Sequence, residues 1–285
     1  MKVWRIAVLD IKTKSKMSTL EKADTSVIIF DCGTHHILEK SLVDWVKDSV
    51  SDKNVTVVRY DKSVSERENI LNNINNKSKY TLVLYSFNPL LTKENVDLIL
   101  DYLILREEKY IQLPYGCAFL TQYYINNSIK DPITFNGDGS QFLKVESPEE
   151  LDYATEVICK RIIVDFARKG VKFINPDTIV INAYVNIEDG VTIYPFNTLS
   201  KDTYIHKNVI LKDGNNITSS VIGVDSVIAN STITNTNIGS NCIVFPYNVI
   251  ENTLIEDNCT IKSHNTINKA KIGKNTTIES FNSIF

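Results

Sequence analysis

The second half of the chain places an aliphatic residue at every sixth position, with occasional slips of one residue. The series reads Ile187, Ile193, Leu199, Ile205, Leu211 and Ile217, then Ile222 and Ile228, then Ile238, Val244 and Ile250, then Ile255, Ile261 and Ile267, and finally Ile272, Ile278 and Ile284. A period of six matches neither an α-helix nor a simple strand. It is typical of triangular coils that point one aliphatic side chain inward from each side. We therefore predict a parallel β-helix of hexapeptide repeats over residues 169–285.

Two cysteines fit this register as small inward-facing residues. Cys242 and Cys259 lie 17 residues apart, which is one coil, and each follows an inward isoleucine by four residues. Neighbouring strands lie about 4.8 Å apart, so we expect the two sulfur atoms to stack inside the coil. The same slot holds Val191, Val209, Ser226 and Thr276 in other coils. We interpret the two cysteines as core residues rather than as a disulfide or a metal pair.

Residues 1–168 alternate between strand and helix patterns. The expected strands are Val3–Leu9, Ser26–Phe30, Val55–Tyr60 and Tyr80–Tyr85, and the expected helices are Leu38–Val50, Val64–Asn76, Lys93–Leu105 and Pro148–Ala167. Such alternation predicts a mostly parallel sheet covered by helices, as in Rossmann-like α/β domains. The basic residues before Gly170 and the glycine itself form a helix C-terminal signal, so the domain boundary falls there.

Composition narrows the classes of function. The formal net charge of −3 over 285 residues gives no reason to expect a nucleic-acid partner. No apolar run approaches the roughly 18 residues that span a bilayer, and the first residues lack the layout of a signal peptide. Five cysteines without a CxxC pair fit a reducing compartment. The sequence thus predicts a cytoplasmic protein with neither a nucleic-acid nor a membrane partner.

Short motifs in both halves carry a resemblance to one family. They are Gly170-Val171-Lys172-Phe173-Ile174-Asn175-Pro176-Asp177, Ile193-Tyr194-Pro195-Phe196, Val244-Phe245-Pro246-Tyr247 and Gln122-Tyr123-Tyr124-Ile125. Over residues 25–285 the chain resembles the bifunctional N-acetylglucosamine-1-phosphate uridylyltransferase and glucosamine-1-phosphate acetyltransferase family. The resemblance implies a reduced nucleotidyltransferase-like domain and a left-handed β-helix. It also implies a sugar nucleotide such as UDP-N-acetylglucosamine as ligand, with Mg²⁺ and acetyl-CoA as cofactors if the family's activities are retained.

The loop after the expected strand Ser26–Phe30 departs from the family's nucleotide loop, which reads A-A-G-x-G-T-[RK]-M. Gly33 and Thr34 are retained, but Asp31 replaces the first glycine and His35 replaces the cation that would face the triphosphate. A neutral histidine is a poor substitute for a permanent charge. Lys40 stands where the family has a later lysine. The resemblance therefore leaves Gly33, Thr34 and Lys40 as candidate nucleotide-binding residues.

The family's catalytic positions are also replaced. Phe87 stands where the family has its Mg²⁺-binding aspartate, and an aromatic ring cannot ligate a hard cation. Glu146 matches the second metal position and is the candidate metal ligand. In the other half, Thr277 stands where the family has its catalytic histidine, and a hydroxyl group is no base at neutral pH.

Two other histidines are candidates for a catalytic base. Aligned coils place His264 in a column with Phe196, Gly214, Ser231, Tyr247 and Phe281, beside a second column of Asn197, Asn215, Thr232, Asn248, Asn265 and Asn282. We interpret His264 as a corner residue in a stacked aromatic column, next to a ladder of amides. The alternative is the base of an acyltransferase of another kind. The same two interpretations apply to His206.

Several functions and partners stay open. The resemblance implies a homotrimer that packs through the β-helix, and the aromatic column agrees with it, because an exposed apolar face needs cover. Ile284 and Phe285 predict an end-on contact at the last coil. We favour a binding or scaffolding homologue with both active sites lost, because Asp31, Phe87 and Thr277 depart together. The alternatives are a sugar-1-phosphate nucleotidyltransferase or acyl-CoA-dependent acyltransferase with altered catalytic residues, or a subunit that joins an intact homologue.

Overall fold

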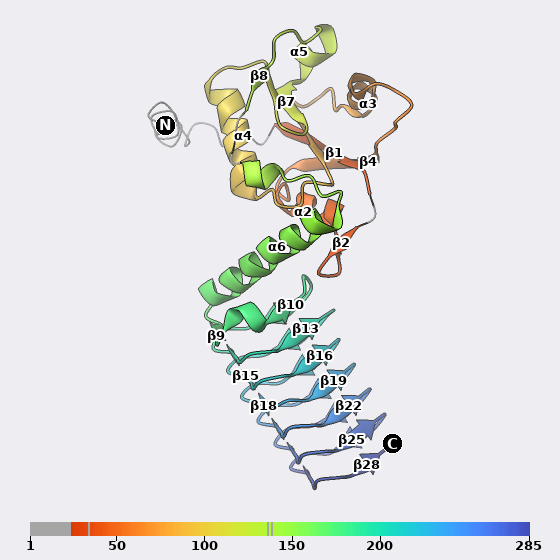
Figure 1. Cartoon of the computed structure of the whole chain (residues 1–285), viewed down its shortest axis with the longest axis vertical. Helices are drawn as coiled ribbons and strands as arrows, with labels where there is room; N and C mark the ends of the chain where they lie inside the picture. The colour runs from red at the N-terminus through yellow and green to blue at the C-terminus, as the bar shows by residue number, and fades with distance from the viewer. Residues whose placement is uncertain (1–23, 34, 136, 138) are drawn as a thin grey trace. The chain divides into compact units, whose positions relative to one another are not determined.

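The computed structural model describes residues 24–33, 35–135, 137 and 139–285. The chain divides into two compact units, Met1–Ala154 and Thr155–Phe285 (Figure 1). The expected strand Val3–Leu9 lies outside the described residues. In the part of the chain that the structure describes, no helix is both long and apolar enough to cross a membrane.

The first unit contains a six-stranded mixed sheet. Its order is β4 (Asn54–Arg59), β1 (Thr25–Asp31), β5 (Tyr80–Tyr85), β7 (Cys117–Leu120), β6 (Tyr110–Gln112) and β8 (Ile133–Thr134). Strand β1 runs parallel to β4 and β5, whereas β7 is antiparallel to both β5 and β6. The α/β prediction is confirmed, but the antiparallel β6–β7 hairpin was not anticipated, because its strands are too short to carry a clear alternation.

Strand β1 is buried on both faces. Val27 and Ile29 belong to one apolar cluster and Ile28 and Phe30 to another, so adjacent side chains enter cores on opposite sides of the sheet. A strand with two buried faces reads as a continuous apolar run, which is why the sequence identified it.

Four helices in this unit are α2 (Leu42–Asp48), α3 (Glu66–Asn73), α4 (Lys93–Leu105) and α5 (Thr121–Asn126). Ser65 and Thr92 begin α3 and α4 with capping boxes. The expected helix Leu38–Val50 starts late, because Leu38 and Glu39 have φ values of 49° and 69°. These residues form the turn of a small hairpin, β2 (His36–Ile37) and β3 (Lys40–Ser41).

A short 3₁₀ turn (Gly139–Phe142) precedes the long helix α6 (Pro148–Arg168). The carboxylate of Glu150 accepts the Ser147 N–H at 2.8 Å, and the Ser147 hydroxyl accepts the Glu150 N–H at 3.2 Å. This reciprocal pair fixes the start of the helix. Near its end, Ile162, Ile163 and Phe166 pack against the core of the β-helix, so the last turns of α6 belong to the second unit.

The second unit is a parallel β-helix, as predicted. Its first sheet contains β10 (Val180–Ile181), β13 (Thr198–Ser200), β16 (Asn216–Thr218), β19 (Thr232–Thr234), β22 (Val249–Glu251), β25 (Thr266–Asn268) and β28 (Ser283–Ile284). The second contains β11 (Asn186–Ile187), β14 (Tyr204–Ile205), β17 (Val221–Ile222), β20 (Asn237–Ile238), β23 (Leu254–Ile255) and β26 (Lys271–Ile272). The third contains β9 (Lys172–Phe173), β12 (Thr192–Ile193), β15 (Ile210–Leu211), β18 (Val227–Ile228), β21 (Ile243–Val244), β24 (Thr260–Ile261) and β27 (Thr277–Ile278). A 3₁₀ turn (Pro176–Thr178) lies in the first coil.

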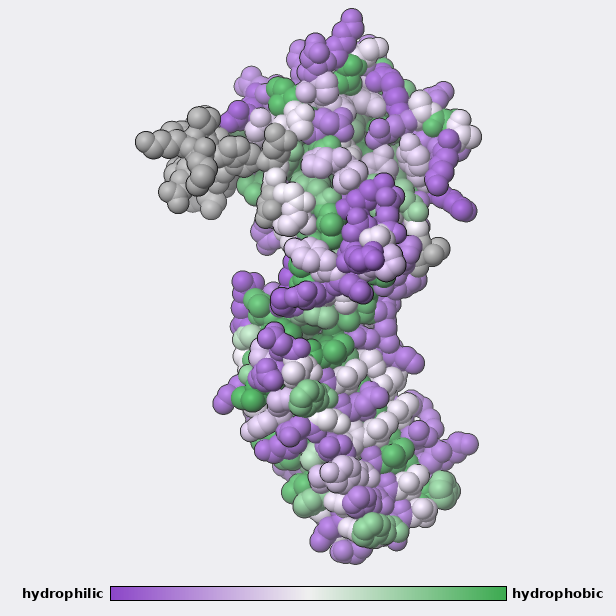
Figure 2. Space-filling model, viewed as in Figure 1, coloured by the Kyte–Doolittle hydropathy of each residue, from purple (hydrophilic) through white to green (hydrophobic). Residues whose placement is uncertain are grey.

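The inward aliphatic residues form one continuous core, and all of the predicted ones from Ile187 to Ile272 are buried. The structure adds Ile233, which is fully buried and pairs with Ile217 and Ile250. Five-residue spacings therefore lie on both sides of Ile233. On the outer surface, hydrophobic side chains occur among hydrophilic ones (Figure 2), and they include Ile243, Phe245, Tyr247 and Val249.

The five-residue spacings around Ile233 shift the predicted columns by one residue. Thr232 pairs with Asn216 and Val249, so Ser231, not Thr232, stands in line with Asn215 and Asn248. Asn230 consequently replaces Ser231 in the column that contains His264. The prediction was wrong here because it did not recognise Ile233 as an inward residue.

Asparagine is common at the corners of the β-helix. Many corner residues have positive φ, among them Asn208, Asn235, Asn241, Asn252, Asn258 and Asn275. Asparagine tolerates the left-handed region better than other residues that have a Cβ atom. The asparagines at these corners thus fit the backbone that the coils require.

Buried polar side chains after each corner join successive coils. The Asn265 N–H donates to Asn248 Oδ1 at 2.8 Å, and the Asn282 N–H donates to Asn265 Oδ1 at 2.7 Å. The predicted amide ladder therefore exists, but most of its bonds run from a backbone N–H to a side chain. Cys242 and Cys259 follow the same rule as free, buried thiols, with the Cys259 N–H 3.4 Å from Cys242 Sγ. This arrangement confirms that they stack in the core.

Candidate functional site

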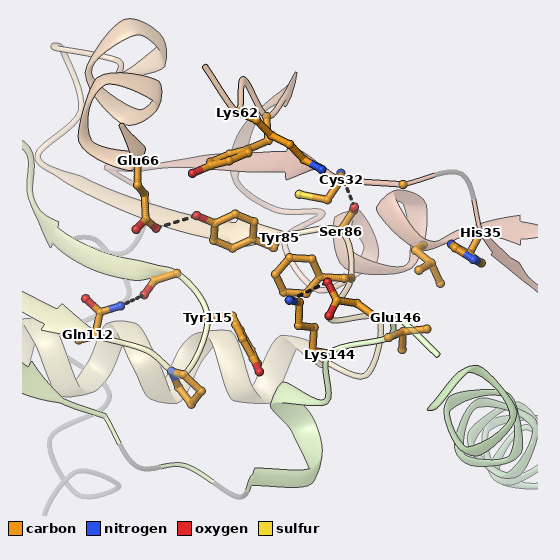
Figure 3. Close-up of a pocket in the computed structure, with 17 residues that line it drawn as sticks. Cys32, His35, Lys62, Glu66, Tyr85, Ser86, Gln112, Tyr115, Lys144 and Glu146 are labelled. Atoms are coloured by element: carbon orange, nitrogen blue, oxygen red, sulfur yellow. Dashed lines mark hydrogen bonds and ion pairs between the residues drawn. The ribbon is translucent and has the colours of Figure 1, made fainter. Parts of the chain in front are cut away.

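A cavity of about 620 Å³ opens where β1, β4 and β5 end (Figure 3). The loops after these strands contribute Cys32, Gly33, Tyr60, Lys62, Ser86 and Phe87. The β6–β7 hairpin adds Gln112, Pro114, Tyr115 and Gly116, and the segment before α6 adds Lys144, Val145 and Glu146. In open α/β sheets, ligands bind at the carboxyl ends of parallel strands. The position of the cavity therefore makes it the candidate ligand site of this unit.

Aromatic rings form one wall of the cavity. The rings of Tyr85 and Phe87 stack with centroids 5.0 Å apart, and Tyr115 meets Phe87 edge-on at 5.3 Å. The Tyr85 hydroxyl donates to Glu66 Oε1 at 2.6 Å. Burial and this hydrogen bond raise the pKa of Tyr85, so the phenol stays protonated. Such a wall can pack against the apolar face of a sugar or a nucleobase.

A lysine and a glutamate lie beside this wall. Lys144 Nζ is 2.6 Å from Glu146 Oε1 and lies over the rings of Phe87 and Tyr115, at 5.2 and 5.8 Å from their centroids. The hydrogen bond to Glu146 raises the pKa of Lys144, which keeps the ammonium charged. The cavity thus contains a fixed cation against an aromatic surface.

Hydrogen bonds hold the segment before α6, which carries Lys144 and Glu146, next to Phe87. The Val145 N–H donates to the Phe87 carbonyl at 2.9 Å. The buried Asn88 amide donates to the carbonyls of Phe142 and Leu143, at 3.2 and 3.0 Å. The loop after β5 and the segment before α6, which lie far apart in the sequence, are therefore fixed to each other.

The predicted nucleotide loop lies at the cavity, but its amides have internal partners. The Cys32 N–H donates to Ser86 Oγ at 2.9 Å, and the Gly33 N–H donates to Asp31 Oδ1 at 3.4 Å. A phosphate cradle needs backbone N–H groups that point at the ligand. Gly33 and His35 line the cavity, whereas Thr34 lies outside the described residues.

Lys40, the third predicted nucleotide-binding residue, is not among the residues that line the cavity. It lies in β3, forms an ion pair with Asp48, and has its ammonium 4.7 Å from the centroid of the Trp45 ring. Trp45 in turn donates its indole N–H to the Ile37 carbonyl at 3.1 Å. In this arrangement Lys40 supports the β2–β3 hairpin against α2.

The resemblance implies Mg²⁺, and the residues at the cavity do not fit that ion. Phe87 and Glu146 line it together, as the alignment requires. However, the Phe87 ring offers no oxygen ligand, and the Glu146 carboxylate is bound to Lys144. Within the described residues, no group of three or more histidine, cysteine, aspartate or glutamate side chains can hold a metal ion.

His264 lies in the aromatic column, at a corner with φ of 62°. Its ring stacks on Tyr247 on one side and on Phe281 on the other, each at 5.0 Å between centroids. Both faces of the imidazole are thus covered by rings, and this geometry agrees with a corner residue of the column.

His206 lies on the outer surface of the second sheet of the β-helix, near two polar neighbours. Its Nδ1 is 3.4 Å from Glu188 Oε1, which also accepts the Tyr204 hydroxyl at 2.8 Å. The hydrogen bond from Tyr204 lowers the pKa of Glu188, together with the Lys207 N–H and His206. A carboxylate that orients an imidazole in this way is a common support for a general base.

Sequence reasoning missed Lys144 and Tyr115, which both lie against the Phe87 ring and line the cavity. Gly116, with φ of 98°, marks the tight turn that presents Tyr115. A glycine next to an aromatic residue was a readable turn signal. No local pattern indicated Lys144, because a long-range hydrogen bond brings its segment to the site.

Comparisons with known proteins identify one family model and several partial relatives. Residues 206–284 match the family model described as GlmU-like, C-terminal hexapeptide. The bifunctional protein GlmU of Clostridium beijerinckii is 35% identical over 106 residues, which are 37% of this chain and 23% of that protein. GlmU of Clostridioides difficile is 34% identical over 107 residues, 38% of this chain and 23% of that protein. The chain thus spans about a quarter of the length of these relatives, and its β-helix is of the GlmU-like hexapeptide type.

Two solved structures were also matched. The acetyltransferase domain of PglB from Neisseria gonorrhoeae is 12% identical with a TM-score of 0.20, covering 90% of this chain and 96% of that chain. Perosamine N-acetyltransferase from Caulobacter crescentus, in complex with CoA and GDP-perosamine, is 11% identical with a TM-score of 0.21, covering 91% of this chain and 90% of that chain.

Proposed function

We propose that this protein is a GlmU-like binding or scaffolding homologue of the sugar-nucleotide pathway. Its α/β cavity binds a sugar phosphate or sugar nucleotide, and it has lost both uridylyl transfer and acetyl transfer. The observation that carries the proposal is the Lys144–Glu146 ion pair against Phe87. Uridylyl transfer needs a metal ion to offset the charge of the phosphates, and this pair engages the carboxylate of Glu146, the candidate metal ligand.

Three features of the cavity support a sugar-phosphate ligand. The Tyr85–Phe87 stack offers an apolar surface, the Glu66 carboxylate and Ser86 offer hydrogen-bond acceptors, and Lys144 offers positive charge. Small-ligand sites combine an apolar wall with few polar groups in this way. The GlmU-like type of the β-helix supports the same class of ligand, because the resemblance to that family implies a sugar nucleotide.

The loss of acetyl transfer rests on Thr277, the exposed first residue of β27. Its hydroxyl group cannot take a proton from an amine at neutral pH. We further propose a homotrimer that packs through the β-helix. Ile243, Phe245, Tyr247 and Val249 are exposed hydrophobic residues around one corner of one coil, and such a surface favours self-association.

The test is a pair of measurements on the full chain. Isothermal titration calorimetry should detect binding of UDP-N-acetylglucosamine. Incubation with UTP and N-acetylglucosamine-1-phosphate, and with acetyl-CoA and glucosamine-1-phosphate, should give no product above background. Pyrophosphate or free CoA released at a rate proportional to protein would overturn the loss of activity, and absence of binding would overturn the ligand class.

A second candidate is an acyl-CoA-dependent acyltransferase that uses an altered base. The observation that favours it is the contact between His206 and Glu188, with Tyr204 on the same carboxylate. It predicts that acetyl-CoA raises the melting temperature of the protein by mass action. It also predicts that His206→Asn abolishes transfer to an amino sugar, whereas His264→Asn does not.

A further inference from the structure

We propose that the Lys144 ammonium is a built-in cation that takes the place of a divalent metal ion in the cavity. The phosphate group of a ligand then binds there without metal. The inference rests on the proposed function, because it assumes that the ligand carries a phosphate group. It goes beyond that function by naming the group that meets the phosphate and by making recognition independent of metal.

The position of the ammonium carries the inference. Lys144 Nζ lies 5.2 Å from the centroid of Phe87 and 2.6 Å from Glu146 Oε1. Phe87 and Glu146 are the two residues that the sequence aligned with metal-binding positions. The positive charge therefore lies close to both residues that stand at the family's metal-binding positions.

Hydrogen bonds of buried residues fix the backbone that carries Lys144. Val145 is buried, and its N–H donates to the carbonyl of Phe87, so the backbone on which Lys144 stands is fixed to the loop that carries the ring. Asn88, also buried, holds the preceding carbonyls of Phe142 and Leu143. A lysine on a freely moving surface segment would lack this support.

The ammonium also has capacity for a second partner. A lysine has three N–H donors, of which one meets Glu146. The Lys144 side chain retains 31% exposure and lines the cavity together with Lys62. A phosphate oxygen that enters the cavity can thus accept a hydrogen bond from Lys144 while the aromatic wall packs against the rest of the ligand.

Glu146 has opposite roles in the two alternatives, which makes the inference testable. With a built-in cation, the Glu146 carboxylate competes with the phosphate for Lys144. Its isosteric replacement by glutamine should then strengthen binding. With a bound metal ion, Glu146 is a ligand of that ion, and the same replacement should weaken binding and its dependence on metal.

The experiment is calorimetric titration of the full chain with UDP-N-acetylglucosamine, once in EDTA and once in excess MgCl₂. We expect equal affinity in both buffers. Lys144→Met should weaken binding by about tenfold or more, because it removes a charge-assisted hydrogen bond. Glu146→Gln should strengthen it severalfold. Lys160→Met is the matched control, since Lys160 pairs with Glu156 on the exposed surface of α6.

Circular dichroism checks that each variant folds, and Glu146→Gln keeps the test valid if Lys144→Met does not. Binding that requires Mg²⁺, together with weaker binding by Glu146→Gln, would overturn the built-in cation and leave the proposed ligand class intact. Binding that is unaffected by either substitution would also overturn it. Absence of binding by the wild-type chain in both buffers would overturn both proposals.

Discussion

The backbone N–H of Asn265 donates to the side-chain oxygen of Asn248 at 2.8 Å, inside the β-helix and away from solvent. The Asn248 amide in turn donates to the Phe245 carbonyl at 2.6 Å. One asparagine therefore satisfies a buried donor of the next coil and also binds a carbonyl of its own coil, which Ser231 Oγ reaches at 3.1 Å as well. Buried polar groups that lose their partners are costly, so the ladder of side chains stabilises the stack of coils.

The first prediction concerns this ladder. Asn248→Ala should lower the free energy of unfolding by about 1–3 kcal/mol for each buried group left without a partner. Asn248→Ser should cost less, because Ser231 fills the same column one coil earlier and accepts the Asn248 N–H at 3.3 Å. Urea denaturation of both variants, with the exposed Asn237→Ala as control, measures the difference. Equal losses in the two variants would contradict the role of the side-chain acceptor.

The second prediction concerns Ile233, the inward residue that the six-residue spacing did not reveal. Its side chain is fully buried between Ile217 and Ile250. Ile233→Ala should lower the free energy of unfolding by about 2–5 kcal/mol, the usual cost of such a core truncation. Val249→Ala, on an exposed side chain of the adjacent coil, should change it by less than about 1 kcal/mol. Similar losses in both variants would show that Ile233 is not part of the core.

Ile233 also shows where sequence reasoning succeeded and where it stopped. A long repeat with regular spacing identifies a β-helix, because every coil independently needs the same inward residues. Two shortened sides in succession break the count locally, and only strand pairing restores the register. The cavity depends on contacts between distant segments, such as the Val145 N–H and the Phe87 carbonyl. The sequence therefore identified Phe87 and Glu146 as positions of interest but could not predict the lysine that lies close to both.

The third prediction concerns Gly116 at the rim of the cavity. Its φ is 98°, and a Cβ atom there would lie 2.1 Å from the Val83 carbonyl oxygen. Gly116→Ala should therefore destabilise the α/β unit by at least about 2 kcal/mol, through backbone strain and this collision. It should also displace Tyr115 and weaken ligand binding. Gly139→Ala is the control, because a Cβ atom there meets nothing within 4 Å. Thermal denaturation followed by circular dichroism compares the two, and an unchanged melting temperature for Gly116→Ala would contradict the expected collision.

The fourth prediction concerns the thiol of Cys32 at the cavity. Partial burial is the main cause that raises the pKa of Cys32 to about 11, and the negative charge of Asp31 is the second. The fraction of Cys32 in the reactive thiolate form should then be only about one in a thousand at pH 8, whereas about a quarter of an ordinary thiol is ionised at that pH. Alkylation of Cys32 by iodoacetamide, followed by mass spectrometry, should be slow at pH 7.5 and should accelerate about tenfold per pH unit up to pH 9.5.

Asp31→Asn tests the cause of this shift. It removes the nearby negative charge, so the pKa of Cys32 should fall and alkylation at a given pH should become faster. An unstructured cysteine peptide provides the reference rate. The folded state holds the Cys32 thiol neutral. The contribution of this thiol to the free energy of unfolding is therefore fully present below the pKa of the unfolded thiol, and it is lost as the pH rises towards 11. A rate that reaches half of its plateau near pH 8.5 in the wild-type protein would show that Cys32 is neither desolvated nor influenced by Asp31.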